Sequence, residues 1–395
     1  MLIEILFFFF LGIAFGTFTG LTPGIHINLI STLLISLSAT IYLNHIYSIV
    51  FISSMAITHT FVDFIPSVFL GCPDLDTELS VLPGHQFLKK GKGFEAIFLS
   101  NKGGLLALPL TVFALIPSIF LLKNIYQKIA TAIPFVLIIL LFAMLITEKN
   151  KKKSILIVIL TGLLGLGINF LSMNQPLFPL LTGLFGVPNI LISIKNKTKI
   201  PKQILTKPKI SLKKPIIGAA ISAPICSFLP GMGAGQAAVL ANTFIKNSRK
   251  GFLVLMGAIN TLVMSFSFIT LFFVKKTRTG AAIAIKNFSS LLTKNEFILI
   301  ILIVLFAGII AYKITNKLAE KIAINIQKIN YKKTSIIVLI ILLIITTIIC
   351  GPKGILILFL SSLLGIYTIK LKVRRTNMMS ALIIPTILWG LKIIK

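Results

Sequence analysis

Gly16-Thr-Phe-Thr-Gly20-Leu-Thr-Pro23-Gly24-Ile-His26-Ile-Asn28 places glycines, a proline and small polar residues between two strongly apolar runs. Proline has no backbone N–H and blocks a preceding carbonyl, and glycine tolerates unusual dihedral angles, so the helical hydrogen-bond ladder is expected to break at Pro23-Gly24. In a membrane, backbone groups freed in this way must face protein or a water-filled cavity. The stretch therefore predicts a broken helix within a membrane-embedded fold.

The composition of the whole chain agrees with this interpretation. Of 395 residues, 56% are hydrophobic and only 12% are charged, against roughly 25% charged residues in a soluble domain. Apolar runs recur from one end to the other, including runs near 96–122 and 129–147. Because about 20 apolar residues cross a bilayer, we expect an all-α polytopic membrane protein with about 10–14 membrane segments. The first run lacks the charged and small-residue flanks of a cleaved signal and is expected to remain as a span.

The formal charge of +30 belongs to this membrane topology. The lysines and arginines lie in short clusters between apolar segments and form no single basic face, as expected for loops that obey the positive-inside rule and attract anionic lipid headgroups. We therefore expect a multi-pass protein of the cell membrane with lipid as a partner and no nucleic-acid role. Cys72, Cys226 and Cys350 are too widely spaced for a metal knuckle or a disulfide framework.

A second broken helix is predicted in the other half of the chain. Ser222-Ala-Pro-Ile-Cys-Ser-Phe-Leu-Pro230-Gly231-Met-Gly233-Ala-Gly235-Gln236 repeats the same residue types, and Pro230-Gly231 follows Pro23-Gly24 after 207 residues. The lysine-rich segment between the two halves suits a loop outside the membrane. We expect a first membrane repeat over 1–194, a basic linker over 195–214 and a second repeat over 215–395, inverted or in tandem, each with one Pro-Gly-broken, re-entrant helix.

Paired broken helices indicate a transporter site, because half-helix N-termini hold an anionic group with free N–H donors and the helix dipole. The alternative for each is a kinked helix that serves packing alone. The predicted ligand is a small anion. The candidate substrate-binding residues are Thr22, Pro23, Gly24, His26, Asn28, Pro230, Gly231, Gly233, Gly235, Gln236, Asn260 and Thr261.

Two ionisable residues interrupt a third apolar run. His59 and Asp63 lie four residues apart in Thr58-His59-Thr60-Phe61-Val62-Asp63, which places them on one helical face where an imidazolium and a carboxylate can pair. Ionisable groups inside a span are functional candidates, and ion or proton coupling is the predicted role, with a purely structural pair as the alternative. The corresponding position of the second half is Asn260-Thr261, which lacks the charge.

No enzyme signature stands out in the chain. The acidic loop Cys72-Pro-Asp74-Leu-Asp76-Thr-Glu78 lacks the glycine and terminal glutamate of an EF-hand and is interpreted as a solvated loop. No zinc motif or serine-nucleophile motif is present. We therefore expect no metal, no cofactor and no catalysis; an intramembrane metalloenzyme built on His26, His59, Asp63 and His85 is the alternative from another class.

Three stretches resemble the permease family of the tripartite tricarboxylate transporters. They are Gly20-Leu-Thr-Pro23-Gly24, Pro230-Gly-Met-Gly233 and the most specific one, Pro66-Ser-Val-Phe-Leu70-Gly-Cys-Pro73 with the following Pro83-Gly84 and Gly91 through Ala96. The family's glycine after the loop proline is Asp74 here, and its loop aspartate is Pro83. The chain is also shorter than the usual permeases, which leaves open a stand-alone relative.

This resemblance implies a secondary transporter for an organic anion such as a di- or tricarboxylate, coupled to H⁺ or Na⁺. It also implies a solute-binding protein and a small membrane subunit as partners, unless the chain acts alone. The paired broken helices are similar, too, to those of polyprenyl-phosphate translocases, so a lipid phosphate is the alternative substrate. Neither the sequence nor the resemblance predicts an oligomeric state.

Overall fold

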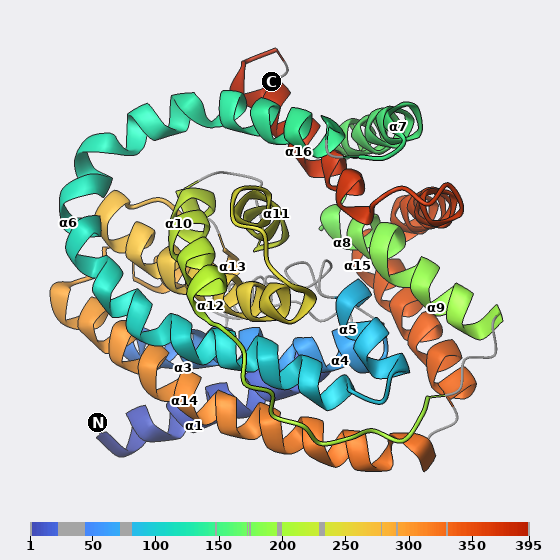
Figure 1. The fold of residues 1–395 in the computed structure, drawn as a ribbon. Coiled ribbons are helices and arrows are strands. Elements are labelled where there is room, and N and C mark those ends of the chain that lie inside the picture. The colour runs from blue at the N-terminus through green and yellow to red at the C-terminus, as the bar shows by residue number, and fades with distance from the viewer. Residues whose placement is uncertain are drawn as a thin grey trace.

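The computed structural model describes residues 2–22, 44–71, 81–146, 148–171, 173, 175–195, 200–228, 234–277, 279–289, 291–328 and 331–393. Within these ranges every regular element is helical (Figure 1). The elements are α1 (Leu2–Leu21), α3 (His45–Val62), α4 (Phe64–Phe69), α5 (Val81–Lys89), α6 (Gly93–Ile146), α7 (Lys151–Asn169), α8 (Leu177–Leu181), η1 (Thr182–Gly186), α9 (Val187–Lys195), α10 (Lys213–Phe228), α11 (Ala234–Phe244), α12 (Arg249–Val274), α13 (Gly280–Phe288), α14 (Lys294–Asn325), η2 (Ile326–Lys328), α15 (Tyr331–Lys370), η3 (Arg375–Met379) and α16 (Ser380–Gly390).

Six helices of the described part are long and apolar enough to cross a bilayer. They cover Leu2–Leu21, His45–Phe69, Gly93–Ile116, Arg249–Val274, Lys294–Asn325 and Lys332–Lys370. The predicted polytopic all-α membrane fold is therefore confirmed, and it requires a membrane location. Pro134–Ile146 and Leu177–Ile192 add shorter apolar helices. The predicted division into two repeats stays a prediction.

The longest helix, α6, curves around one side of the molecule and encloses α10, α11 and α12 (Figure 1). It joins two apolar runs that the sequence separates by polar residues between Lys123 and Lys128. Those residue types are compatible with a helix, so the drop in hydrophobicity does not mark the end of the helix. α14 packs against the first part of α6: the amide of Asn101 donates to the carbonyl of Tyr312 (3.2 Å), and Gly308 lies against Leu108.

Glycines bring α1 and α3 into close contact along their length. A side chain at Gly12 would meet Phe51, one at Gly16 would meet Met55, and one at Gly20 would meet Val62. The partner number rises with the glycine number, so the two helices run in the same direction. Small residues spaced by four allow this backbone approach, which is the packing mode typical of membrane helices.

A second close crossing joins α6 to α12. The position of a Cβ at Gly103 is occupied by the backbone of Val254, and that of a Cβ at Gly257 is occupied by the backbone of Ser100. Farther along, Gly104 lies against the side chain of Thr261. The order of these contacts shows that α6 and α12 also run in the same direction.

Helices α3 and α12, in contrast, run in opposite directions. Gly104 of α6 lies against Phe61 of α3, whereas Gly93 at the start of α6 lies against Phe69 at the end of α4. α3 and α4 are therefore antiparallel to α6, and also to α12, which runs parallel to α6. Both α3 and α12 are almost entirely buried, so they form the centre of the molecule.

The lysine-rich segment between α9 and α10 is not helical over residues 200–212, and most of its lysines are exposed. It is anchored through Gln203, whose side chain donates to the carbonyl of Leu88 (3.2 Å) and accepts from the N–H of Gly93 (2.8 Å). Ile204 donates its N–H to the carbonyl of Gly91 (2.7 Å). The segment therefore lies across the start of α6.

Candidate functional site

The described residues bring together a buried polar cluster where α1, α3 and α12 meet, which we call the polar junction. It comprises Thr19, His59, Thr60, Asp63, Asn260 and Thr261. Each of these residues is at most 3% exposed. Burial of so many polar groups is costly unless they bond to one another, so their arrangement is specific.

His59 receives a partner from α1. Its Nδ1 lies 3.0 Å from the hydroxyl oxygen of Thr19, with the proton position set by the imidazole tautomer. The close packing at Gly16 and Gly20 brings Thr19 within reach, because a larger side chain at either position would push α1 away from α3. The glycine spacing of α1 thus positions a polar contact as well as an apolar one.

Asp63 receives a partner from the other half of the chain. It lies between α3 and α4, and its carboxylate Oδ2 accepts a hydrogen bond from Nδ2 of Asn260 (2.8 Å). The same amide donates to the carbonyl of Thr60 (3.1 Å). Asp63 is the C-cap residue of α3. The end of this helix therefore lies at the contact between the Asp63 carboxylate and α12.

Thr60 and Thr261 complete the junction. Their hydroxyl oxygens lie 3.4 Å apart, beside Gly104 of α6. Polar contacts between spans hold helices in register, and each contributes up to about 1–2 kcal/mol. The sequence placed Asn260 and Thr261 as the counterparts of the His59 region; the structure shows that the two regions touch.

The other predicted substrate-binding residues are placed only in part. Thr22 follows the last turn of α1 and donates its hydroxyl to the carbonyl of Phe18 (2.8 Å), while Gly235 is buried at the start of α11. The side chain of Gln236 and the residues Pro23, Gly24, His26, Asn28, Pro230, Gly231 and Gly233 lie outside the described residues, as does the acidic loop from Cys72 to Glu78. Their predicted roles remain predictions.

Thr19 and Thr60 were not selected from the sequence. Threonine is common in membrane spans, where its hydroxyl usually bonds to the carbonyl of the preceding turn, so neither residue stands out. The usable signal was spacing: Thr19 is three residues from Gly16 and lies on the glycine face of α1. Thr60 follows His59 directly, as Thr261 follows Asn260.

A second polar region lies beyond α4. His85 of α5 is buried against Gly71, and Arg375 opens η3. Burial, together with the positive charges of Lys89 and Arg375, lowers the pKa of His85 from its ordinary 6.5 to about 4, against the opposing effect of a hydrogen bond to the backbone of Val68. Burial also lowers the pKa of Arg375, to about 10. His85 is therefore neutral at physiological pH.

This neutral histidine predicts a loss of stability in mild acid. Below pH 6.5 the unfolded chain binds a proton at His85 that the folded protein does not bind, so stability falls as the pH drops toward about 4. The loss is at most roughly 3 kcal/mol. Thermal unfolding of the purified protein between pH 7.5 and 4.5 measures it, and a His85→Gln variant should show a flatter pH dependence. An equally steep decline in the variant would contradict the assignment.

No group of three or more His, Cys, Asp or Glu side chains within the described ranges is arranged to hold a metal ion. The residues offered for an intramembrane metalloenzyme are not gathered there: His59 and Asp63 belong to the polar junction and His85 to the second polar region. His26 lies outside the described residues. The described geometry therefore provides contacts between helices and no assembled metal centre.

A set of long apolar helices around a buried polar junction defines a polytopic membrane protein. The chain matches, over residues 6–380, the family described as "Tripartite tricarboxylate transporter TctA family". It belongs to this family. It is also 32% identical over 405 residues to "Uncharacterized protein MJ1079" of Methanocaldococcus jannaschii, covering 98% of this chain and 99% of that protein. No solved structure matches it.

Proposed function

We propose that this permease carries an organic anion of the di- or tricarboxylate class and couples its movement to H⁺ or Na⁺. The observation that supports this most is the contact between Asp63 and Asn260, because it places an ionisable group at the buried meeting point of the two halves. A carboxylate in this position is costly to keep without a function. Its proton or bound cation would alter how α3 and α12 pack, and such a change is what coupling requires.

His59 is the second coupling candidate. It lies one helical turn before Asp63, and its contact with Thr19 connects α1 to the same junction. An imidazole can gain or lose a proton, and such a change at His59 would alter the bonding of the α1–α3 pair. In this proposal Asp63 carries the coupling ion, and His59 transmits the change to α1 and so to the predicted hinge at Pro23-Gly24.

The two predicted Pro-Gly hinges supply the anion site in this proposal. Thr22 at the end of α1 and Gly235 at the start of α11 mark where the described helices reach them. Free N–H groups at half-helix N-termini bind carboxylates without a charged side chain. Asn260 and Thr261 are further proposed substrate contacts.

Transport assays test the proposal directly. Purified protein in liposomes should take up labelled citrate or a smaller dicarboxylate when a proton or sodium gradient is imposed, and should stop when an ionophore collapses that gradient. If the liposomes take up neither citrate nor a dicarboxylate under any gradient, the substrate assignment is wrong. If uptake persists when a proton ionophore or a sodium ionophore is added, the anion assignment stands and the proposed coupling to H⁺ or Na⁺ is wrong.

Arg375 is expected to contribute to anion affinity. Its side chain has no hydrogen bond or ion pair with the described residues, and burial lowers its pKa to about 10, so a substrate carboxylate would relieve an uncompensated cation. Arg375→Gln should raise the KM for citrate by about tenfold, equal to about 1.4 kcal/mol of binding. The KM of the Arg375→Lys variant should lie between those of the unchanged protein and Arg375→Gln.

The neighbouring Arg374 provides the control for this prediction. It is exposed, and its guanidinium lies 3.8 Å from Glu148, so Arg374→Gln removes an equal charge from the same segment. An equal rise in KM for both variants would indicate a general charge effect and not a contact with the substrate.

The family is the large membrane component of a three-part system, which supports a solute-binding protein and a small membrane subunit as partners. We propose this assembly for the chain, with direct uptake by the permease alone as the other outcome. Adding candidate partner proteins to the liposomes distinguishes the two: activity that appears only with a binding protein supports the three-part system.

A further inference from the structure

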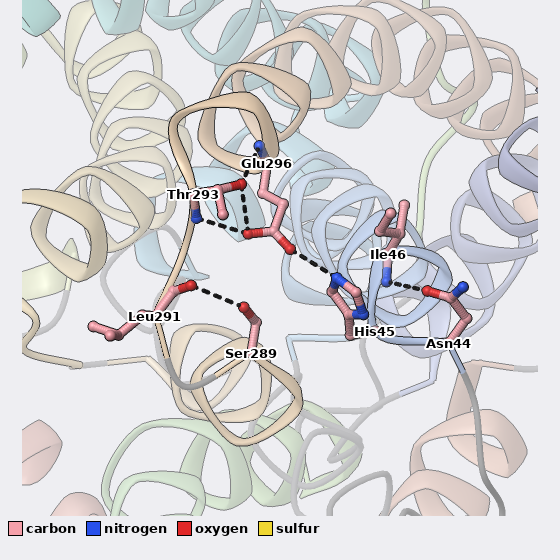
Figure 2. A network of polar contacts seen from close by, with 7 residues as sticks. All are labelled: Asn44, His45, Ile46, Ser289, Leu291, Thr293 and Glu296. Atoms are coloured by element: carbon pink, nitrogen blue, oxygen red, sulfur yellow. Dashed lines mark hydrogen bonds and ion pairs between the residues drawn. The ribbon is translucent and has the colours of Figure 1, made fainter.

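Two ion pairs join the halves of the chain, and each lies where two parallel helices begin. In the first, Nε2 of His45 at the start of α3 lies 3.0 Å from Oε1 of Glu296 at the start of α14 (Figure 2). Glu296 also bonds the backbone N–H (2.7 Å) and the hydroxyl (2.9 Å) of Thr293, which caps α14. The carboxylate is thus fixed by its own helix and reaches across to α3.

The second ion pair has the same plan at the start of α12 and α6. Nζ of Lys250 in α12 lies 2.7 Å from Oε1 of Glu95 in α6. The hydroxyl of Thr206 donates to the other carboxylate oxygen (2.7 Å). Glu95, like Glu296, is the third residue of its helix and is largely buried.

The two ion pairs lie on opposite sides of the polar junction. Because α3 and α12 run in opposite directions, the beginning of α3 with α14 and the beginning of α12 with α6 are at opposite ends of the central helices. A separation of 201 residues relates Glu95 to Glu296, and the same separation relates Thr60 to Thr261, which touch each other. The shared separation fits the predicted repeat of the two halves, with the two glutamates at corresponding positions.

We infer that these pairs are two clasps that close the interface between the halves at its opposite ends, and that the His45–Glu296 clasp is the one whose cation depends on protonation of a histidine. Alternating access needs an interface that opens at one end while it stays closed at the other. The two clasps are not chemically equal: the imidazole of the first is positively charged only when it is protonated, whereas the cation of the second is a lysine.

Among the described residues, the other charged groups near the His45 end do not supply this response. The helices packed there carry Glu4 on α1, Lys286 on α13 and Lys294 on α14, with Tyr47 on α3 itself. None of these residue types titrates between about pH 6 and 8 in model peptides. Loss of the proton from the His45 imidazole should weaken this clasp and leave the Lys250–Glu95 clasp unchanged.

Cysteine labelling in nanodiscs tests both clasps without requiring transport. Cys72, Cys226 and Cys350 are first replaced by alanine. Ser48, a buried residue one turn after His45, and Ser100, a buried residue of α6 near Glu95, are then changed to cysteine one at a time. The reaction rate with a water-soluble maleimide reports the opening of each end, and nanodiscs expose both ends to the reagent.

Each clasp variant should open its own end only. Glu296→Gln should raise labelling at position 48 about tenfold and leave position 100 unchanged, and Glu95→Gln should do the reverse. Glutamine preserves the helix cap at position 296, since Gln also serves at the third position of a capping box. Equal effects of either variant at both positions, or no effect of either, would overturn the inference.

The pH response has reciprocal controls. From pH 6 to pH 8, the labelling rate at position 48 should increase several-fold more in the protein with His45 than in a His45→Lys variant. The His45→Lys variant measures how much of the increase comes from the thiol itself. Lys250→His should confer a similar extra increase on position 100. If His45→Lys leaves the pH dependence unchanged, the clasp is not the sensor. The meaning of the clasps as gates rests on the proposed transport function, but the labelling result stands or fails independently of it.

Discussion

Replacing Asp63 with asparagine is expected to reduce gradient-driven uptake by on the order of 100-fold, equivalent to about 2.7 kcal/mol. Asparagine has nearly the same shape and still offers an oxygen to Nδ2 of Asn260, so the 2.8 Å hydrogen bond between α3 and α12 can persist. What is lost is the group that binds a proton or cation. Exchange of labelled for unlabelled substrate across the membrane, which needs no net ion movement, should be retained.

The comparison of the two assays separates coupling from folding. Loss of uptake together with exchange would mean that Asp63 serves substrate binding or structure. Glu148→Gln is the matched control, because Glu148 is also a buried carboxylate that accepts from an asparagine amide, that of Asn377 (2.8 Å). It lies outside the polar junction, and its replacement should leave the ratio of uptake to exchange unchanged. Full uptake by Asp63→Asn would exclude the proposed coupling role.

The fold class was predictable because it depends on averages over long segments. Hydrophobicity, the scarcity of charge and the basic clusters together require many spans, and six long apolar helices are present in the described part. Helix boundaries were less predictable: α6 continues through a polar stretch that interrupts its hydrophobicity. A membrane helix can extend beyond the apolar run that identifies it.

The candidate site was predictable one residue at a time but not as a contact. Asp63 and Asn260 stood out because polar groups are rare within spans, yet nothing in a single sequence says that positions 197 residues apart share a hydrogen bond. That contact depends on glycines that bring α6 close to α12 and on the opposite directions of α3 and α12. The ion pairs of His45 and Lys250 depend on the same geometry.

The glycine at position 257 is expected to be among the least replaceable residues of the chain. A Cβ there would overlap the backbone of Ser100 in α6, and backbone atoms cannot move aside as a flexible side chain does. Overpacking of this kind costs about 1–3 kcal/mol or more. Gly257→Ala should lower the midpoint of thermal unfolding by about 5 °C or more, and it should reduce transport because the separation of α12 from α6 determines where Asn260 meets Asp63.

Gly167→Ala is the control that gives this prediction its meaning. Gly167 lies in α7, and among the described residues no atom outside its own helix lies within 4 Å of the position of its Cβ. The same chemical change there adds a methyl group to open space and replaces glycine with a better helix former, which favours folding by up to about 1 kcal/mol. The two variants should therefore shift the unfolding temperature in opposite directions. Equal stability of both would mean that the α6–α12 crossing is not the close contact on which the polar junction depends.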